Sequence, residues 1–215
     1  GKILKEKIFE NIWIQPASGD AGGSIGAALA YWHLDQEQER DVDPNDSMSG
    51  SYLGPEFTDS EIENELLNIG ANFKKLDDND LLNNTADDLS NGNAIGWFQG
   101  RMEFGPRALG ARSILGDPRS PSMQKNLNLK VKYRESFRPF APSILEEDLT
   151  EWFNLDSNSP YMLLVADIKL DKKVKMTEKE EKLFGIDKLN IKRSEIPAVT
   201  HVDYSARVQT VNKKN

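Results

Sequence analysis

The sequence has no cysteine and only two histidines, His33 and His201. The lack of cysteine excludes disulfide bonds and thiolate metal sites. Two histidines are too few for a self-contained histidine-rich metal centre. No apolar run approaches the roughly 20 residues that span a bilayer, and the N-terminus lacks the charged, apolar and small-residue succession of a signal peptide. We therefore expect a cytoplasmic protein without a membrane partner.

Basic residues are also in the minority, with 27 lysines and arginines against 35 aspartates and glutamates and a net charge of −8. Because nucleic-acid binding needs a basic surface, we expect no nucleic-acid partner. The charge is unevenly distributed, since residues 35–91 hold sixteen acidic and three basic residues and residues 101–138 hold nine basic and three acidic. This segregation predicts a focused anion site in the second stretch, with a solvated basic face as the general alternative.

Short helical and strand patterns follow one another without internal repeats, which predicts an α/β or α+β fold. An acidic stretch that becomes rich in Ser, Asn and Gly ends before Tyr52, so we divide the chain into domains at 1–48 and 49–215. Thr58 with Glu61, and Thr177 with Glu180, form capping boxes that mark two helix starts. The other expected helices are 2–10, 21–33, 80–89, 106–112 and 149–153, and the expected strands are 11–15, 94–98, 140–145, 161–170, 198–202 and 207–211.

The first segment with chemical potential is Gly-Arg-Met-Glu-Phe-Gly-Pro-Arg-Ala-Leu-Gly-Ala-Arg-Ser at 100–113. It follows an expected strand, and Pro106 suits the first position of a helix. A helix N-terminus offers free N–H groups and a partial positive charge, so an arginine in its first turn predicts binding of phosphate or carboxylate. The alternative is pairing with acidic neighbours such as Glu103. The arginines concerned are Arg101, Arg107 and Arg112.

The second segment is Val-Lys-Tyr-Arg-Glu-Ser-Phe-Arg-Pro-Phe-Ala-Pro at 131–142. Lys132, Arg134 and Arg138 share even parity, so an extended backbone would place them on one face. Pro139 disfavours helix at the residue before it, which supports that expectation. Charge-assisted hydrogen bonds contribute roughly 1.5–3 kcal/mol each, enough in combination to hold a polyphosphate. The alternative is a basic rim that protects a strand edge.

Two further segments carry weaker signals. His201, Asp203 and Arg207 bring an imidazole, a carboxylate and a guanidinium within seven residues, although an isolated histidine is more often structural. Asp20, in Gln-Pro-Ala-Ser-Gly-Asp-Ala-Gly-Gly-Ser-Ile-Gly at 15–26, could face a metal or a phosphate. The same aspartate could equally cap the helix that begins beside it.

Together these four segments resemble the O-carbamoyltransferase family of nodulation and antibiotic-tailoring enzymes, with the matches in family order at 15–29, 100–119, 133–147 and 196–211. The resemblance implies a C-terminal YrdC-like domain, with a twisted mixed sheet and flanking helices. Before it stands a small remnant of an actin/hexokinase-type ATPase domain. It also implies that ATP and carbamoyl phosphate form carbamoyl-adenylate, from which the carbamoyl group passes to a hydroxyl of a small acceptor. The implied cofactors are Mg²⁺ with ATP, and Fe²⁺ in the first domain.

By this resemblance Lys132, Arg138 and Arg207 are the catalytic candidates. The candidates for binding the nucleotide and carbamoyl phosphate are Arg101, Arg107, Arg112, Lys132, Arg134, Arg138, Met162, His201 and Arg207, and the candidate metal ligand is Asp20. Phosphoryl chemistry is mostly positioning and charge neutralisation, so such a set needs no nucleophile.

The chain departs from the family pattern at Tyr204-Ser205, where glycine followed by threonine or serine is usual. A tyrosine lacks glycine's backbone freedom, so the turn there is expected to differ. An Asn-Thr-Ser-Phe-Asn segment after residue 211 and most of the first domain are absent, so both ends are expected to be boundaries within a longer protein. We expect this chain alone to be inactive in the full transfer reaction. The alternatives to an enzyme are an interaction module and a nucleotide sensor that has lost the chemistry.

Overall fold

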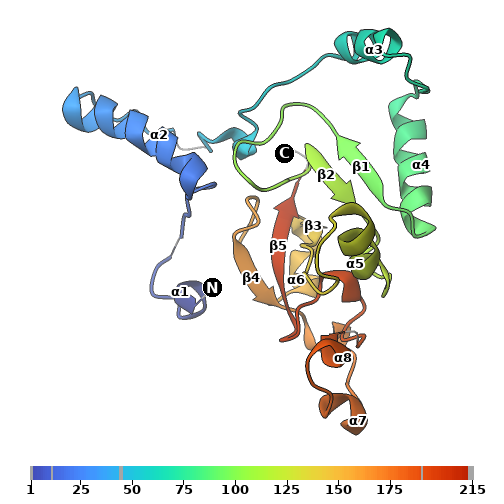
Figure 1. Cartoon of the computed structure of the whole chain (residues 1–215). Coiled ribbons are helices and arrows are strands. Elements are labelled where there is room, and N and C mark those ends of the chain that lie inside the picture. Colours follow the sequence, from blue (N-terminus) through green and yellow to red (C-terminus); the bar gives the residue numbers. More distant parts are fainter. Residues whose placement is uncertain (1, 11, 44–45, 190, 213–215) are drawn as a thin grey trace. The chain divides into compact units, whose positions relative to one another are not determined.

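The computed structural model describes residues 2–10, 12–43, 46–189 and 191–212. Helices and strands are mixed, and the sheets are small, which confirms the expected α/β class (Figure 1). The chain divides into two compact units. One, here called the sheet unit, comprises the described parts of Gly1–Glu10, Thr85–Ile95 and Ile114–Asn215. The other, here called the loop unit, comprises those of Asn11–Asn84 and Gly96–Ser113.

The sheet unit is built on three strands, β3 (Ser143–Leu145), β4 (Leu164–Asp167) and β5 (Ser205–Val211). Their order is β3-β5-β4, so the last strand of the chain lies in the middle. β3 runs parallel to β5, with Ser143 opposite Gln209. β4 runs antiparallel to β5, with Asp167 opposite Ser205. The sheet is therefore mixed, and its central strand joins elements distant in sequence.

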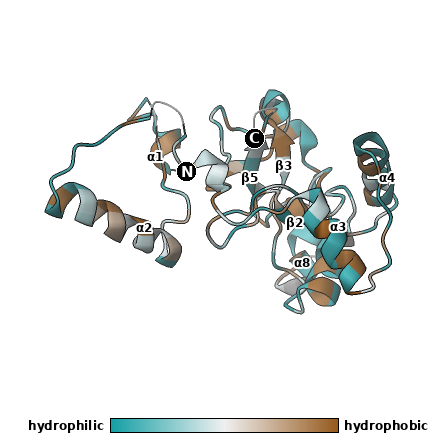
Figure 2. Cartoon of the chain, turned by 90° about the horizontal axis from the view of Figure 1, so that it is seen from above, coloured by the Kyte–Doolittle hydropathy of each residue, from teal (hydrophilic) through white to brown (hydrophobic). Residues whose placement is uncertain are grey.

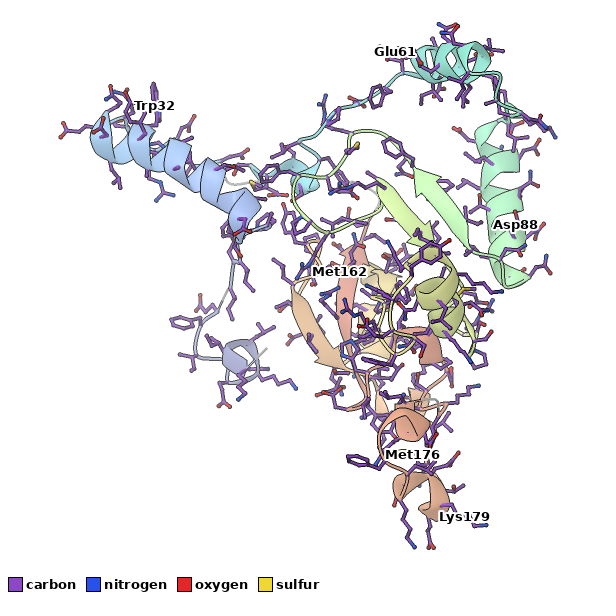
Figure 3. All side chains as sticks on the ribbon, viewed as in Figure 1. Trp32, Glu61, Asp88, Met162, Met176 and Lys179 are labelled. Atoms are coloured by element: carbon purple, nitrogen blue, oxygen red, sulfur yellow. The ribbon has the colours of Figure 1, made fainter. Side chains whose placement is uncertain are left out.

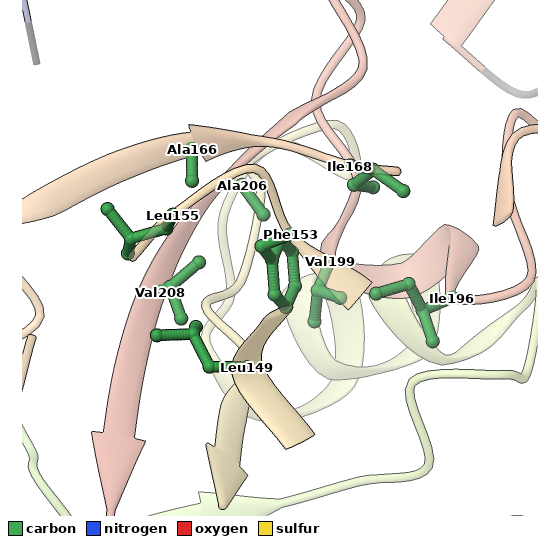
Figure 4. Close-up of a cluster of buried hydrophobic side chains, with 9 residues drawn as sticks. All are labelled: Leu149, Phe153, Leu155, Ala166, Ile168, Ile196, Val199, Ala206 and Val208. Atoms are coloured by element: carbon green, nitrogen blue, oxygen red, sulfur yellow. The ribbon is translucent and has the colours of Figure 1, made fainter. Parts of the chain in front are cut away.

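A hydrophobic core covers one face of this sheet (Figure 4). Ala206 and Val208 are fully buried, as is Ile168 just after β4. Because side chains alternate along a strand, Ala206 and Val208 share a face and the odd-numbered residues of β5 take the other. The remaining buried members of the cluster are Leu149, Phe153, Leu155, Ala166, Ile196 and Val199. A second, smaller cluster consists of Met123, Leu127 and Ala198.

The sheet unit also contains short helices. They are α1 (Lys2–Lys5), α5 (Met123–Asn126), η3 (Leu127–Val131), η4 (Glu146–Asp148), α6 (Leu149–Trp152), η5 (Leu170–Lys172), α7 (Glu178–Glu181), α8 (Ile186–Leu189) and η6 (Pro197–Val199). The capping box predicted at Thr177 is present at the start of α7. Helix α6 confirms the expected helix at 149–153.

The loop unit holds α2 (Asp20–Ala30), η1 (Tyr31–Asp35), η2 (Ser49–Ser51) and α3 (Asp59–Asn68). The predicted capping box between Thr58 and Glu61 opens α3. Helix α4 (Asp78–Ser90) follows. No residue of α2, α3 or α4 is buried, and hydrophilic and hydrophobic residues mix along them (Figure 2). Strands β1 (Ile95–Phe98) and β2 (Arg112–Leu115) pair in a two-stranded sheet.

Several expected elements were wrong. The strand expected at 11–15 does not form in its described residues 12–15, whose apolar side chains are exposed, and Asn11 lies outside the described residues. The strand expected at 198–202 was wrong: its first two residues lie in the 3-10 helix η6, for which Pro197 suits the first position, and residues 200–202 form no strand. The helix expected at 2–10 ends at Lys5, and Lys7 then adopts a positive φ of 51°. The strand expected at 161–170 is shortened to β4 by a turn around Met162, whose φ is 54°.

Candidate functional site

The glycine- and arginine-rich segment of the loop unit is an ordered loop, so the expected helix at 106–112 was wrong. Its organiser is Glu103, whose side chain is completely buried. The carboxylate accepts hydrogen bonds from the backbone N–H groups of Leu109 (2.6 Å) and Ala111 (2.8 Å). Glycines with φ of 99° and 120°, at 105 and 110, supply the turns around it. A buried carboxylate thus replaces the helix N-terminus as the feature that shapes the segment.

The three arginines of this segment have different surroundings. Arg112 donates to Glu103 at 3.1 Å, so the alternative of local pairing is correct for it. Arg101 donates to the carbonyl of Gly54 (2.8 Å) and pairs with Glu56 (3.1 Å) at an exposed position. Arg107 is half-buried, and its Nε is buried without a hydrogen-bonding partner among the described residues. Of the three, Arg107 is the one whose guanidinium is left to bind something else.

Tyr52 also contacts the loop that Glu103 organises. Its hydroxyl donates to the carbonyl of Leu109 at 3.1 Å. Burial, and secondarily the negative charge of Glu103, raise the pKa of Tyr52 above its ordinary value. The phenol therefore stays protonated and remains a donor across the physiological range.

In the sheet unit, the stretch with Lys132, Arg134 and Arg138 is a compact turn, and the expected extended conformation was wrong. Lys132 has near-helical angles and Tyr133 has a positive φ of 48°. The N–H groups of Lys132 and Arg134 donate back to the carbonyls of Leu127 and Asn128. The prediction that Lys132, Arg134 and Arg138 share one face of an extended backbone is therefore wrong, although the three residues still lie in one loop.

Asn128 holds that loop together, and no sequence pattern indicated this role. It is fully buried, and its amide donates to the carbonyls of Ser136 (3.0 Å) and Arg138 (2.8 Å). Its carbonyl oxygen accepts from Nε of Arg134 at 2.6 Å. The Arg134 guanidinium also lies 5.1 Å from the ring centre of Phe140. Arg134 is therefore fixed on two sides.

The other two cations of the loop face solvent. Arg138 is exposed and pairs with Glu135 at 2.8 Å, a contact that contributes little in water. Lys132 is exposed, with no ion pair to another described residue. Both remain accessible to a ligand.

The parallel pairing of β3 with β5 brings two of the predicted segments to one edge of the sheet. Parallel strands begin at the same edge. The loop that ends at Arg138 leads into the start of β3, and His201 lies just before the start of β5. Arg207 lies early in β5, on the face opposite Ala206 and Val208. The contact of α5 with η6, through Met123, Leu127 and Ala198, supports the same arrangement.

His201, Asp203 and Ser205 form a hydrogen-bonded chain at this edge. The hydroxyl of Ser205 donates to Oδ1 of Asp203 at 2.6 Å and lies 3.0 Å from Nδ1 of His201. The N–H of Ser205 also donates to Oδ1 of Asp203, at 3.0 Å. The hydrogen bonds from Ser205 lower the pKa of Asp203, so the carboxylate is ionised at neutral pH. An aspartate bonded to the N–H two residues on is a turn signal that could have been found in the sequence.

The ionisation of His201 follows from its surroundings. Burial lowers its pKa below the ordinary value; the charge of Asp203 opposes this, and the charge of Arg207 adds to it. The influence of both charges shows that Asp203 and Arg207 lie near the ring. His201 is therefore neutral at physiological pH, which makes it a hydrogen-bonding group rather than a further cation.

Tyr204 has a φ of 62°, within the region that favours glycine. Tyr204 therefore adopts the left-handed backbone conformation although it carries a side chain. The change from glycine to tyrosine does not by itself require a different backbone conformation at this position. Its ring lies 5.0 Å from Nζ of Lys173, a cation–π contact that offsets part of the backbone strain.

Met162 lies at the other end of the β4–β5 ladder. The turn before it is tied to β5 by Ser159, which receives a hydrogen bond from the N–H of Thr210 and donates its hydroxyl to the carbonyl of Val208. Met162 is 9% exposed, and Figure 3 labels it beside the sheet. Since Leu164 is opposite Val208, Met162 is closer to Thr210 than to Ser205. The structure does not bring it together with His201.

Asp20 is the first residue of α2 and makes no side-chain cap. Among the described residues no group of three or more His, Asp or Glu side chains could hold a metal ion. One carboxylate does not make an iron site, so the described residues do not by themselves fit Fe²⁺. The helices of the described chain also include none that is long and apolar enough to cross a membrane.

Each unit thus carries one cation-bearing loop ordered by a buried polar residue, Glu103 in the loop unit and Asn128 in the sheet unit, and the sheet unit also holds the neutral His201. Comparison with known families defines its class. Residues 86–215 match the family described as Carbamoyltransferase C-terminus, and residues 1–29 match Carbamoyltransferase N-terminus. The chain belongs to the carbamoyltransferase family.

Comparisons with individual relatives support the same family. The chain is 40% identical to nodulation protein NolNO of Sinorhizobium fredii, over 99% of this chain and 28% of the relative. It is 39% identical to nodulation protein NolO of Bradyrhizobium diazoefficiens, over 100% of this chain and 35% of the relative. It is 58% identical to the uncharacterized protein sll1178 of Synechocystis, over 99% and 35%. The chain thus spans about a third of the length of these curated relatives.

Proposed function

We propose that the chain binds ATP and carbamoyl phosphate and is the part of a carbamoyltransferase that forms carbamoyl-adenylate. In the overall reaction, carbamoyl phosphate, ATP and one water give carbamoyl-adenylate, phosphate and pyrophosphate. The carbamoyl group then passes to a hydroxyl of a small acceptor, and AMP leaves. Because the chain spans about a third of the length of the nodulation relatives NolNO and NolO, the transfer step is assigned in this proposal to the longer protein.

The observation that carries the proposal is the meeting of cationic segments at one edge of the three-stranded sheet. Parallel pairing brings the loop of Lys132 and Arg138 to the edge where His201 and Arg207 lie. Lys132 and Arg138 are exposed there, whereas the chain as a whole is acidic. A cationic site in an acidic protein concentrates small anions without attracting polyanions in general.

Each residue has a role that follows from its chemistry. Lys132 and Arg138 would neutralise phosphoryl oxygens as charge develops on them, and Arg207 would orient the carbamoyl phosphate. Arg134 is fixed by Asn128 and Phe140, so it would bind with little loss of side-chain entropy. Met162 would contribute an apolar wall. In the loop unit, Arg107 would bind a phosphate oxygen, while Arg101 and Arg112 have protein partners and would act mainly by shaping the loop.

Metal ions enter the proposal in two ways. Mg²⁺ would arrive with ATP and reduce the charge of its phosphates. Fe²⁺ would need ligands beyond Asp20, so it is assigned to the remainder of a longer protein and no step of adenylate formation depends on it. The protein would act in the cytoplasm, where ATP and carbamoyl phosphate are made.

Titration calorimetry with Mg·ATP tests the binding part of the proposal. Lys132→Ala and Arg107→Ala each remove a charged hydrogen-bond donor, so each should weaken ATP binding by about 10- to 150-fold. Lys179→Ala and Arg119→Ala are matched controls, because Lys179 is exposed on α7 and Arg119 pairs with Asp117 on the surface. The control variants should bind as the parent does. Absence of ATP binding by the parent protein, or equal loss in controls, would rule the proposal out.

A further inference from the structure

Resting on the proposed function, we infer that His201 selects the carbamoyl group by accepting a hydrogen bond from its NH2 through Nε2. The substrate class is an acyl phosphate that carries an amide nitrogen. The group rejected is the acyl phosphate of the same shape that carries a methyl there, such as acetyl phosphate. His201 is thus a specificity-determining residue rather than one more anion anchor.

The tautomer of His201 is set by its neighbours. Ser205 has one hydroxyl proton, and Asp203 can only accept, so the 2.6 Å hydrogen bond uses that proton. The Ser205 oxygen, 3.0 Å from Nδ1, must then accept, which places the ring proton on Nδ1. In a neutral imidazole Nε2 then carries a lone pair. The chain Asp203–Ser205–His201 therefore ends in an acceptor.

Nε2 of His201 is available to accept a hydrogen bond from a ligand. Among the residues that the structure describes, Nε2 of His201 has no hydrogen-bonding partner, and the residue is only partly buried. Burial keeps the ring neutral at physiological pH by lowering its pKa. The facing charged groups are Asp203 and Arg207, whose effects on the ring are opposite in sign.

The neighbouring cation explains how the carbamoyl group would reach this acceptor. Arg207 lies close enough to His201 for its charge to act on the imidazole. A phosphate bound at Arg207 would therefore hold the attached carbonyl group beside the ring. A hydrogen-bond acceptor there favours the NH2 of a carbamoyl group over the methyl of an acetyl group. The charge of Arg207 cannot distinguish the two acyl phosphates. Both acyl phosphates carry the same phosphate charge.

Two stable phosphonates separate these roles. Phosphonoacetamide carries the amide NH2, and acetonylphosphonate has a methyl in its place. In calorimetric titrations of the full-length protein, phosphonoacetamide should bind about five- to tenfold more tightly, as one net hydrogen bond predicts. His201→Phe should reduce this ratio to about one, while the affinity for inorganic phosphate stays unchanged. His201→Gln, which keeps an acceptor oxygen, should restore part of the ratio.

Ser205→Ala provides a second variant that keeps the histidine. Without the serine oxygen, the proton is free to move to Nε2, so the ratio should fall about threefold or more. His33→Phe is the matched control, since His33 lies in the loop unit and bonds the carbonyl of Gln38. It should leave the ratio unchanged. Selectivity that persists in His201→Phe and in Ser205→Ala would overturn the inference.

The failure of the inference is distinguishable from that of the proposed function. If the parent protein binds both phosphonates equally, and Arg207→Ala weakens both, the anion site stands and the role of His201 is wrong. If neither phosphonate nor inorganic phosphate binds, the proposed function fails and the inference fails with it.

Discussion

The two units of this chain are ordered in different ways. The sheet unit is held by contacts between distant segments, with Ala206, Val208 and Ile168 fully buried around a strand from the end of the chain. Helices α2 and α3 of the loop unit have no buried residue, and α3 relies on a local device, the capping box at its start. The difference shows that burial fixes the sheet that carries the proposed anion site, whereas short-range polar contacts fix helix α3 of the loop unit.

The largest effect should come from removing a core side chain. Leu149→Ala in α6 removes a side chain that is 3% exposed and should lower the free energy of unfolding by about 2–5 kcal/mol. Leu67→Ala in α3, where the side chain is 62% exposed, should change it by no more than about 0.5 kcal/mol. Denaturant titration followed by circular dichroism compares the two. Equal losses would contradict the contrast between the units.

A smaller effect is expected at Glu103, the buried carboxylate that orders the loop at 103–112. Glu103→Gln removes the charge that attracts Arg112 and leaves an amide facing two N–H donors. The loss should be about 1–3 kcal/mol, and it should weaken ATP binding through the displaced Arg107. Glu56→Gln, at an exposed ion pair with Arg101, is the matched control and should have almost no effect. Thermal melting and ATP titration of both variants test this.

Loss of a helix cap should have a local effect. Thr58→Ala removes the oxygen that accepts from the N–H of Glu61 at 3.3 Å, at a cost of about 1 kcal/mol to α3. Hydrogen exchange should accelerate in residues 59–68 and remain unchanged in β5. Acceleration that extends to β5 would show that the two kinds of order are coupled.

The smallest effect concerns the titration of His201. Its pKa lies below the ordinary value, so its neutral form favours the folded state. This stabilisation is present above the pKa of the unfolded chain and is lost as the pH falls through the lower folded-state value. Asp203→Asn removes a charge that raises the pKa and should lower it further; Arg207→Ala should raise it. Imidazole NMR titrations measure both shifts, and shifts in the opposite directions would contradict the described surroundings.

Local sequence signals predicted much of the fold. Both capping boxes and helices α2, α4 and α6 were confirmed, because each depends on neighbours a few residues away. Strands β1 and β5 were also confirmed, although β5 pairs with segments that are distant in sequence. The helix expected at 106–112 was wrong, because this stretch is a loop as far as residue 111. Pro106 is a good helix start, but the buried carboxylate of Glu103 takes the N–H groups of Leu109 and Ala111. Hydrogen bonds of this kind, between a buried carboxylate and N–H groups six and eight residues further along the chain, produce no periodic pattern in the sequence.

In the candidate site, too, local features could be predicted from the sequence, whereas features that depend on the fold could not. The residue types of the cationic loops could be found from the charge pattern, but their conformation could not. The compact turn at Lys132 depends on Asn128, a buried amide in an unremarkable helical stretch. The roles of the candidate residues, and the domain boundary at 48 and 49, stay predictions. The neutral state of His201 depends first on burial of the ring and then on the charge of Arg207, and only the fold supplies both.

The measurement that tests the central claim most directly is release of pyrophosphate from ATP by the full-length protein. The proposal predicts release only when carbamoyl phosphate is present, and a loss of at least tenfold in Arg207→Ala with no change in the surface variant Lys179→Ala. Pyrophosphate release that is absent, or that proceeds equally without carbamoyl phosphate, would contradict the formation of carbamoyl-adenylate.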